Sequence, residues 1–195
     1  MKGLLIKDLY MMKSYCRMHL ILLLGFGFLA FADKGNGFFL LYPAVMAGSI
    51  PMTLLAYETQ CGWESYCQAL PVTRRQQVTV KYLINLLAVG ATVLLDLVLM
   101  LILGNPLAPT LEMLGMVLLT GICSGALLLP PIFKFGVEKG RIAYYVVLGA
   151  MCALSFQVDL SAGAALPPFL PWLLAPVILL LSWALSCKLY QNREL

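Results

Sequence analysis

Two acidic residues stand in stretches of the sequence where an acid is costly. Asp96 lies inside an apolar run over residues 82–103, and Glu112 stands near the start of the next apolar run. A charged side chain facing lipid is expensive, so an acid in such a run is a candidate functional group. Two neighbouring carboxylates would suit proton relay, and either could line a cargo path or a gate. The alternative is that Asp96 faces a hydrated vestibule and Glu112 lies at the membrane interface.

The remaining reactive residues form no recognisable catalytic centre. His19 is the only histidine, and the six cysteines contain no C-x-x-C pair. No spacing matches a zinc site or a nucleophile–base pair. The phosphate-binding pattern G-x4-G-K-[ST] does not occur either. We therefore expect this chain not to be an enzyme and to bind no metal or nucleotide by itself.

The composition indicates which environment these residues occupy. Of 195 residues, 62% are hydrophobic and 11% are charged, and the mean hydropathy is +0.91. A soluble domain carries about 25% charged residues because its surface faces water. The chain is therefore predicted to be a polytopic membrane protein.

Six apolar runs are candidates for membrane-spanning helices, because such a helix needs about 20 mostly apolar residues. They cover residues 19–32, 38–57, 82–103, a run from 107–113 to 133, 142–158 and 169–190. The first and fifth are short and would need tilt, neighbouring helices or a thinner bilayer. We expect an all-α fold with a transmembrane domain over 19–190 and a tail over 191–195.

The distribution of cations predicts the orientation of these spans. If the spans alternate in direction, all but one of the 13 lysines and arginines fall on one side, and Lys34 is the exception. The positive-inside rule assigns the basic side to the cytoplasm. Both termini are therefore predicted to be cytoplasmic.

Residues 1–18 are predicted to form an amphipathic helix in the plane of the interface. Lys7, Lys13 and Arg17 fall on one arc of a helical projection together with Lys2, opposite a mostly apolar face. Such a helix places its cations at anionic head groups. Asp8 points from the apolar face, so it should either pair with a cation of the 58–81 segment or stabilise the first helical turn.

The segment over residues 58–81 is too aromatic to be a simple linker. Trp63, Tyr66 and Leu70 share one face of a short predicted helix, which Pro71 ends. Thr73 can cap a second helix that begins with Arg74 and Arg75. The aromatic face could dock into a groove on another protein or lie on the membrane surface.

This segment resembles the first cytoplasmic loop of bacterial ABC transporter permeases of the type-2 class. The matching residues are Glu58, Trp63, Tyr66, Leu70-Pro71-Val72-Thr73-Arg74-Arg75, Val78 and Lys81-Tyr82-Leu83. The opening residues 1–9 and the stretch over 129–141 are similar to the same small-permease family. The nearest type is the permease of phenol-soluble-modulin-like peptide exporters.

The resemblance implies a transport subunit of the bacterial cell membrane. Such permeases pair as two membrane subunits, homodimeric or heterodimeric, with two separate ATPase subunits that bind ATP and Mg. The loop would be a coupling helix that contacts the ATPase through Glu58, Trp63, Tyr66, Leu70, Pro71, Arg74 and Arg75. The leader with Lys7, Asp8, Lys13 and Arg17 would be an elbow helix. Residues 159–171 would form an outer re-entrant segment.

The sequence does not identify the cargo. The resemblance favours export of amphipathic or antimicrobial peptides, whereas a lipid or a small hydrophobic drug fits the same architecture. The alternative function is a stand-alone carrier or channel that uses Asp96 and Glu112. Copurification of an ATPase would distinguish the two.

Overall fold

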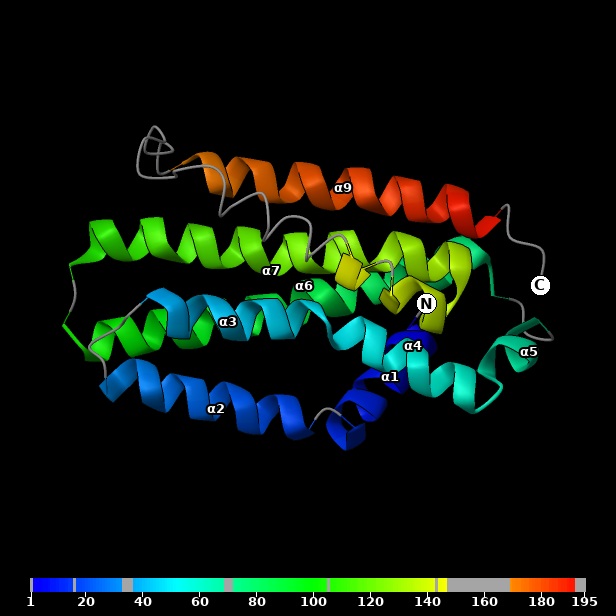
Figure 1. Ribbon diagram of the computed structural model, residues 1–195, viewed down its shortest axis with the longest axis horizontal. Helices are drawn as coiled ribbons and strands as arrows, with labels where there is room; N and C mark the ends of the chain where they lie inside the picture. Colours follow the sequence, from blue (N-terminus) through cyan, green and yellow to red (C-terminus); the bar gives the residue numbers. More distant parts are fainter. Residues whose placement is uncertain are drawn as a thin grey trace.

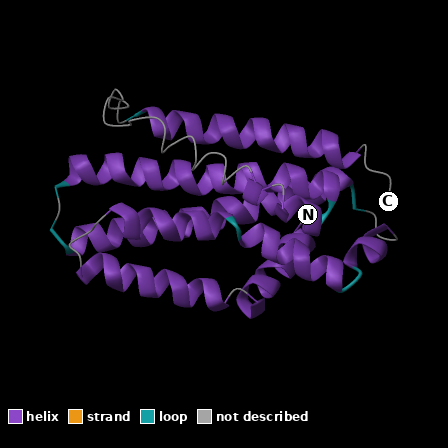
Figure 2. Ribbon diagram, in the orientation of Figure 1, coloured by secondary structure: helices purple, strands orange, loops and turns teal. Residues whose placement is uncertain are grey.

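The structure is a computed structural model that describes residues 2–15, 17–32, 37–68, 72–104, 106–142, 144–146 and 169–191. Within these ranges every regular element is an α-helix, as Figure 2 shows. The predicted all-α class is confirmed for this part of the chain.

The helices form an elongated bundle (Figure 1). They are α1 (Lys2–Tyr15), α2 (Arg17–Ala32), α3 (Gly37–Gly48), α4 (Ile50–Gln60), α5 (Trp63–Gln68), α6 (Arg74–Ile102), α7 (Leu107–Phe135) and α9 (Leu170–Gln191). Residues 137–142 and 144–146 are also helical. Helix α7 packs against α3, α6 and α9, so it forms the centre of the bundle. Helix α1 lies obliquely, and α5 lies at one end (Figure 1).

Four helical stretches are long and apolar enough to cross a membrane. They are Phe39–Gln60, Arg74–Ile102, Pro109–Phe135 and Leu170–Gln191. The predicted first span corresponds to α2, whose 16 residues extend only about 24 Å at 1.5 Å per residue. Most of the predicted fifth span and of the segment over 159–171 lies outside the described residues. These four helices agree with the predicted membrane protein, while six spans remain a prediction.

The predicted leader helix over 1–18 ends earlier than expected. Helix α1 ends at Tyr15, and α2 begins at Arg17. The change of direction lets apolar residues of α1 pack on the core of α4 and α6, while α2 runs along the bundle. The packing residues of α1 are Leu4, Leu5, Met11 and Met12.

The second predicted span is interrupted between α3 and α4. Pro51 occupies the first turn of α4, and the Ser49 hydroxyl donates to the Met46 carbonyl at 2.7 Å. Gly48 lies against α7 so closely that a Cβ there would be 2.5 Å from the Gly121 carbonyl oxygen. Small residues allow membrane helices to approach in this way. The interruption therefore lies beside a close contact between α3 and α7.

Helix α6 begins at a complete capping box. The Gln76 backbone N–H donates to Thr73 Oγ1, and the Thr73 backbone N–H donates to Gln76 Oε1. Each bond satisfies a backbone amide that the first helical turn leaves unpaired. The predicted cap at Thr73 is confirmed.

Candidate functional site

Four charged side chains from three helices meet at the end of the bundle next to α5. Lys7 and Asp8 belong to α1, Glu58 to the last turns of α4, and Lys81 to the second turn of α6. Lys81 Nζ lies 2.7 Å from Asp8 Oδ2 and 2.8 Å from Glu58 Oε1. Lys7 Nζ lies 2.9 Å from Asp8 Oδ1 and also pairs with Glu58. We call Lys7, Asp8, Glu58 and Lys81 the ion cluster.

The ion cluster is buried and electrically balanced. Only 1% of Asp8, 6% of Glu58 and 4% of Lys81 is exposed, while Lys7 is half-buried. Burial lowers the pKa of Lys7, but the carboxylates of Glu58 and Asp8 outweigh it and hold this pKa above its usual value. Ions removed from water must be paired, because an unpaired buried charge costs several kcal/mol. The cluster therefore fixes α1, α4 and α6 relative to one another.

Helix α5 rests on this cluster through one aromatic ring. Lys7 Nζ lies 4.1 Å from the centroid of the Trp63 ring, a distance that allows a cation–π interaction. The Trp63 and Tyr66 rings are 5.5 Å apart, and Cys67 on the same helix is buried. Tyr66 is 60% exposed. Trp63 thus fastens α5 to the bundle, and Tyr66 is presented on its surface.

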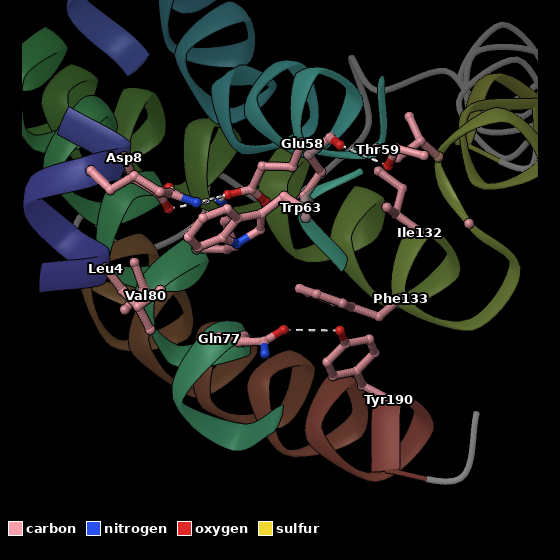
Figure 3. Close-up of a pocket in the computed structure, with 15 residues that line it drawn as sticks. Leu4, Asp8, Glu58, Thr59, Trp63, Gln77, Val80, Ile132, Phe133 and Tyr190 are labelled. Carbon is pink, nitrogen blue, oxygen red and sulfur yellow. Dashed lines mark hydrogen bonds and ion pairs between the residues drawn. The ribbon is translucent and has the colours of Figure 1, made fainter. Parts of the chain in front are cut away.

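A cavity of about 60 Å³ adjoins the ion cluster. Figure 3 shows Trp63 beside Asp8 and Glu58, across this cavity from Phe133 and Tyr190. A polar space of this size can hold water molecules. Residues of α1, α4, α6, α7 and α9 therefore meet around one small cavity that includes the ion cluster.

Arg74 and Arg75 join α6 to α9. Arg74 donates to the carbonyl oxygens of Tyr190 at 3.1 Å and Gln191 at 3.0 Å, at the last turn of α9. The Arg75 guanidinium lies 4.9 Å from the centroid of the Trp183 ring. The expected role of these arginines in ATPase contact does not follow from this placement, because both are engaged within the subunit.

The structure places Asp96 and Glu112 in different surroundings. Asp96 is buried in α6, and its Oδ2 has no hydrogen-bond partner among the described residues. Glu112 is exposed near the start of α7. No hydrogen bond joins the two acids in the described ranges, and a proton relay between them stays a prediction. A role of Asp96 alone in a cargo path or gate stays a prediction.

Asp96 belongs to a polar stripe that the sequence reading missed. Lys81, Asn85, Thr92 and Asp96 are all buried, and their spacing places them within one narrow arc of α6. The Asn85 side-chain amide has no hydrogen-bond partner among the described residues. Helical spacing of polar residues inside an apolar run was the signal that could have found the stripe.

The remaining predicted residues are either exposed or undescribed. Lys13 and Arg17 are exposed on α1 and α2. Leu70 and Pro71 lie outside the described residues. Asp8 pairs with Lys81, a cation of the 58–81 segment, as one of its two predicted alternatives required. No group of three metal-ligating side chains occurs within the described ranges.

Comparison with known proteins identifies the family. The profile described as ABC-2 family transporter protein matches residues 3–191, nearly the whole chain. No curated protein and no solved structure matches the chain. The match agrees with the apolar helices that are able to cross a membrane. The chain therefore belongs to the ABC-2 family of transporter proteins and is a membrane permease component of an ABC transporter.

Proposed function

We propose that this chain is the permease subunit of an ATP-driven exporter in the bacterial cell membrane. Members of the family generally form dimers and pair with ATPase subunits. In the proposed complex, two permease copies, or this chain and a related one, bind two ATPase subunits. ATP and Mg are bound by those partners, because this sequence lacks the phosphate-binding loop.

The proposed orientation places the ion cluster in the cytoplasm. The start of α6 and the C-terminal ends of α7 and α9 share one end of the bundle with α1 and α5 (Figure 1). These segments carry Arg74, Arg75, Lys134 and Lys188 besides the cations of α1. The opposite end holds the connection between α6 and α7, which has no lysine or arginine. The positive-inside rule supports cytoplasm at the basic end.

The ATPase is proposed to dock on α5. The observation that carries this proposal is that α5 is fastened at Trp63 while Tyr66, on the same short helix, is exposed. An exposed aromatic side chain is a typical anchor at a protein interface. If the ATPase displaced α5, Trp63 would move against Lys7. Because Lys7 belongs to the ion cluster, this movement would also shift α1, α4 and α6, which the cluster joins.

The cargo is proposed to be an amphipathic or antimicrobial peptide, by analogy with the exporters that the sequence resembles. A stand-alone carrier that uses Asp96 and Glu112 together is less well supported, because one acid is buried and the other is exposed.

Association with the ATPase tests this proposal. The tagged chain would be purified from membranes of its own cells, and copurifying proteins that contain a phosphate-binding loop would be identified by mass spectrometry. Tyr66→Ala should reduce recovery of the ATPase more than tenfold, because a lost aromatic anchor often costs over 2 kcal/mol. Tyr10→Ala is the matched control, since Tyr10 is an exposed tyrosine of α1. Equal recovery with both variants would refute docking on α5.

A further inference from the structure

A second and much larger cavity is lined by none of the four residues of the ion cluster. Its volume is about 300 Å³, and α1, α2, α3, α4 and α6 all contribute to its wall. The floor is buried and includes Ala47, Ile50 and Ala88, whereas the rim includes the exposed residues Leu22 and Leu95. The cavity is therefore open at the surface between α2 and α6.

The wall of this cavity is suited to an apolar ligand. Thr92 contributes a hydroxyl, but this hydroxyl already donates to the Val89 carbonyl at 2.7 Å. Among the described residues that line the cavity, Lys13 is the one that carries a charge, and it stands on the exposed rim. No ion pair joins Lys13 to another residue that the structure describes. The cavity thus combines an apolar interior with one available cation at its opening.

The opening lies on a surface that fits hydrocarbon. On α6, Val98 and Ile102 are 52% and 69% exposed, and on α2, Leu29 is 45% exposed. By helical spacing Val98 and Ile102 share a face of α6 with the rim residue Leu95, and Leu29 shares a face of α2 with Leu22. Such exposed apolar faces lie against lipid in a membrane protein. A lipid molecule can therefore reach the cavity sideways, without passing through the protein.

We propose that this cavity binds one acyl chain of an anionic phospholipid, with the lipid phosphate at Lys13. The cavity wall spans residues 88–95 of α6, which is about 10 Å along the helix axis and enough for a substantial part of a chain. Basic pockets between membrane helices bind anionic head groups on the cytoplasmic side. The bound lipid would bridge α1 and α2 to α6.

Lipid retention by the full-length protein tests the head-group assignment. Native mass spectrometry would compare binding of phosphatidylglycerol and phosphatidylcholine with identical acyl chains to protein purified in detergent. The wild type should retain one phosphatidylglycerol per chain with a preference of about fivefold, which corresponds to the roughly 1 kcal/mol expected from one cation near a head group. Lys13→Gln should abolish the preference. Lys188→Gln, an exposed cation of α9, should leave it unchanged.

The cavity assignment is tested by filling the opening. Ala91 stands exposed on the rim, so Ala91→Trp should reduce retention of both lipids by at least fivefold. Leu94→Trp is the matched control on the same helix, because Leu94 is exposed and does not line the cavity. Equal retention by the two tryptophan variants would overturn the acyl-chain site. Lys13 is on the surface, so the Lys13→Gln variant should fold. If this variant still preferred phosphatidylglycerol to phosphatidylcholine, that result alone would overturn the proposal.

Discussion

At the scale of single residues, the ion cluster is the feature with the strongest energetic consequences. Asp8 and Glu58 each contact both lysines, so neither carboxylate can be removed without leaving excess positive charge in a buried site. Such a cluster stabilises the fold only while it is complete. Its members should therefore respond to substitution very differently from exposed charges.

Glu58→Gln should lower the free energy of unfolding by about 3–5 kcal/mol, the usual effect of removing one partner of a buried ion pair. The double variant Glu58→Gln/Lys81→Met should recover part of this loss, because charge balance returns. Glu112→Gln is the control, since an exposed substitution changes stability by about 0.5 kcal/mol or less. Denaturation of the three variants in one detergent measures this. Equal stability of Glu58→Gln and Glu112→Gln would contradict the account of the cluster.

Cys67 reports whether α5 is docked. Burial raises the pKa of the Cys67 thiol and limits access to it, whereas Cys61 is exposed just before α5. Since the thiolate is the reactive form, a maleimide at neutral pH should modify Cys61 much faster than Cys67. Trp63→Ala should raise the rate at Cys67 about tenfold or more by releasing α5, whereas Tyr66→Ala should not. Peptide mapping of modified sites measures both rates, and an unchanged rate at Cys67 in Trp63→Ala would show that Trp63 does not fasten α5.

At the scale of elements, local signals in the sequence predicted local structure well. The cap at Thr73 was predictable because the capping side chains stand three residues apart. Apolar runs predicted the helices that could cross a membrane, because a helix satisfies its own backbone hydrogen bonds where lipid offers no partner.

Tertiary partners could not be predicted in the same way. The residues alone left Trp63 either in a docking surface or on the membrane surface, and they gave no sign that its ring contacts Lys7, from a helix more than 50 residues away. The resemblance implied an ATPase contact for Arg74 and Arg75, but no pattern indicated that they also contact α9, Arg74 at its last turn and Arg75 at Trp183. Helical periodicity shows which residues share a face, but it does not show what that face packs against.

The contact between α3 and α7 gives a prediction about an element. Gly48→Ala would place a Cβ 2.5 Å from the Gly121 carbonyl oxygen and 1.9 Å from Ser124 Oγ. Side-chain rotation cannot relieve the backbone contact, so the helices must separate, at a cost of about 1–3 kcal/mol. Gly90→Ala is the control, because nothing lies within 4 Å of the added Cβ. Thermal unfolding in detergent compares the two, and equal melting temperatures would contradict the close packing of α3 on α7.

At the scale of the whole molecule, the proposed orientation is open to direct measurement. A cysteine would be introduced at one of two positions. Lys139 lies between α7 and α9 at the basic end, and Pro106 lies between α6 and α7 at the opposite end. In intact cells a membrane-impermeant maleimide should modify the introduced thiol at position 106 and not that at position 139. Both substitutions are made in a background with the native cysteines replaced by serine. Modification only at position 139 would show that the protein has the opposite orientation in the membrane, and would contradict the proposed topology.

The central claim is that α5 is the point at which the ATPase binds this permease. The most direct measurement is photo-crosslinking in native membranes, with p-benzoylphenylalanine replacing Tyr66, and Tyr10 as the matched control position. The account predicts that position 66 forms an adduct with a protein that carries a phosphate-binding loop, whereas position 10 does not. An adduct only with lipid at position 66, or the same ATPase adduct from both positions, would contradict it.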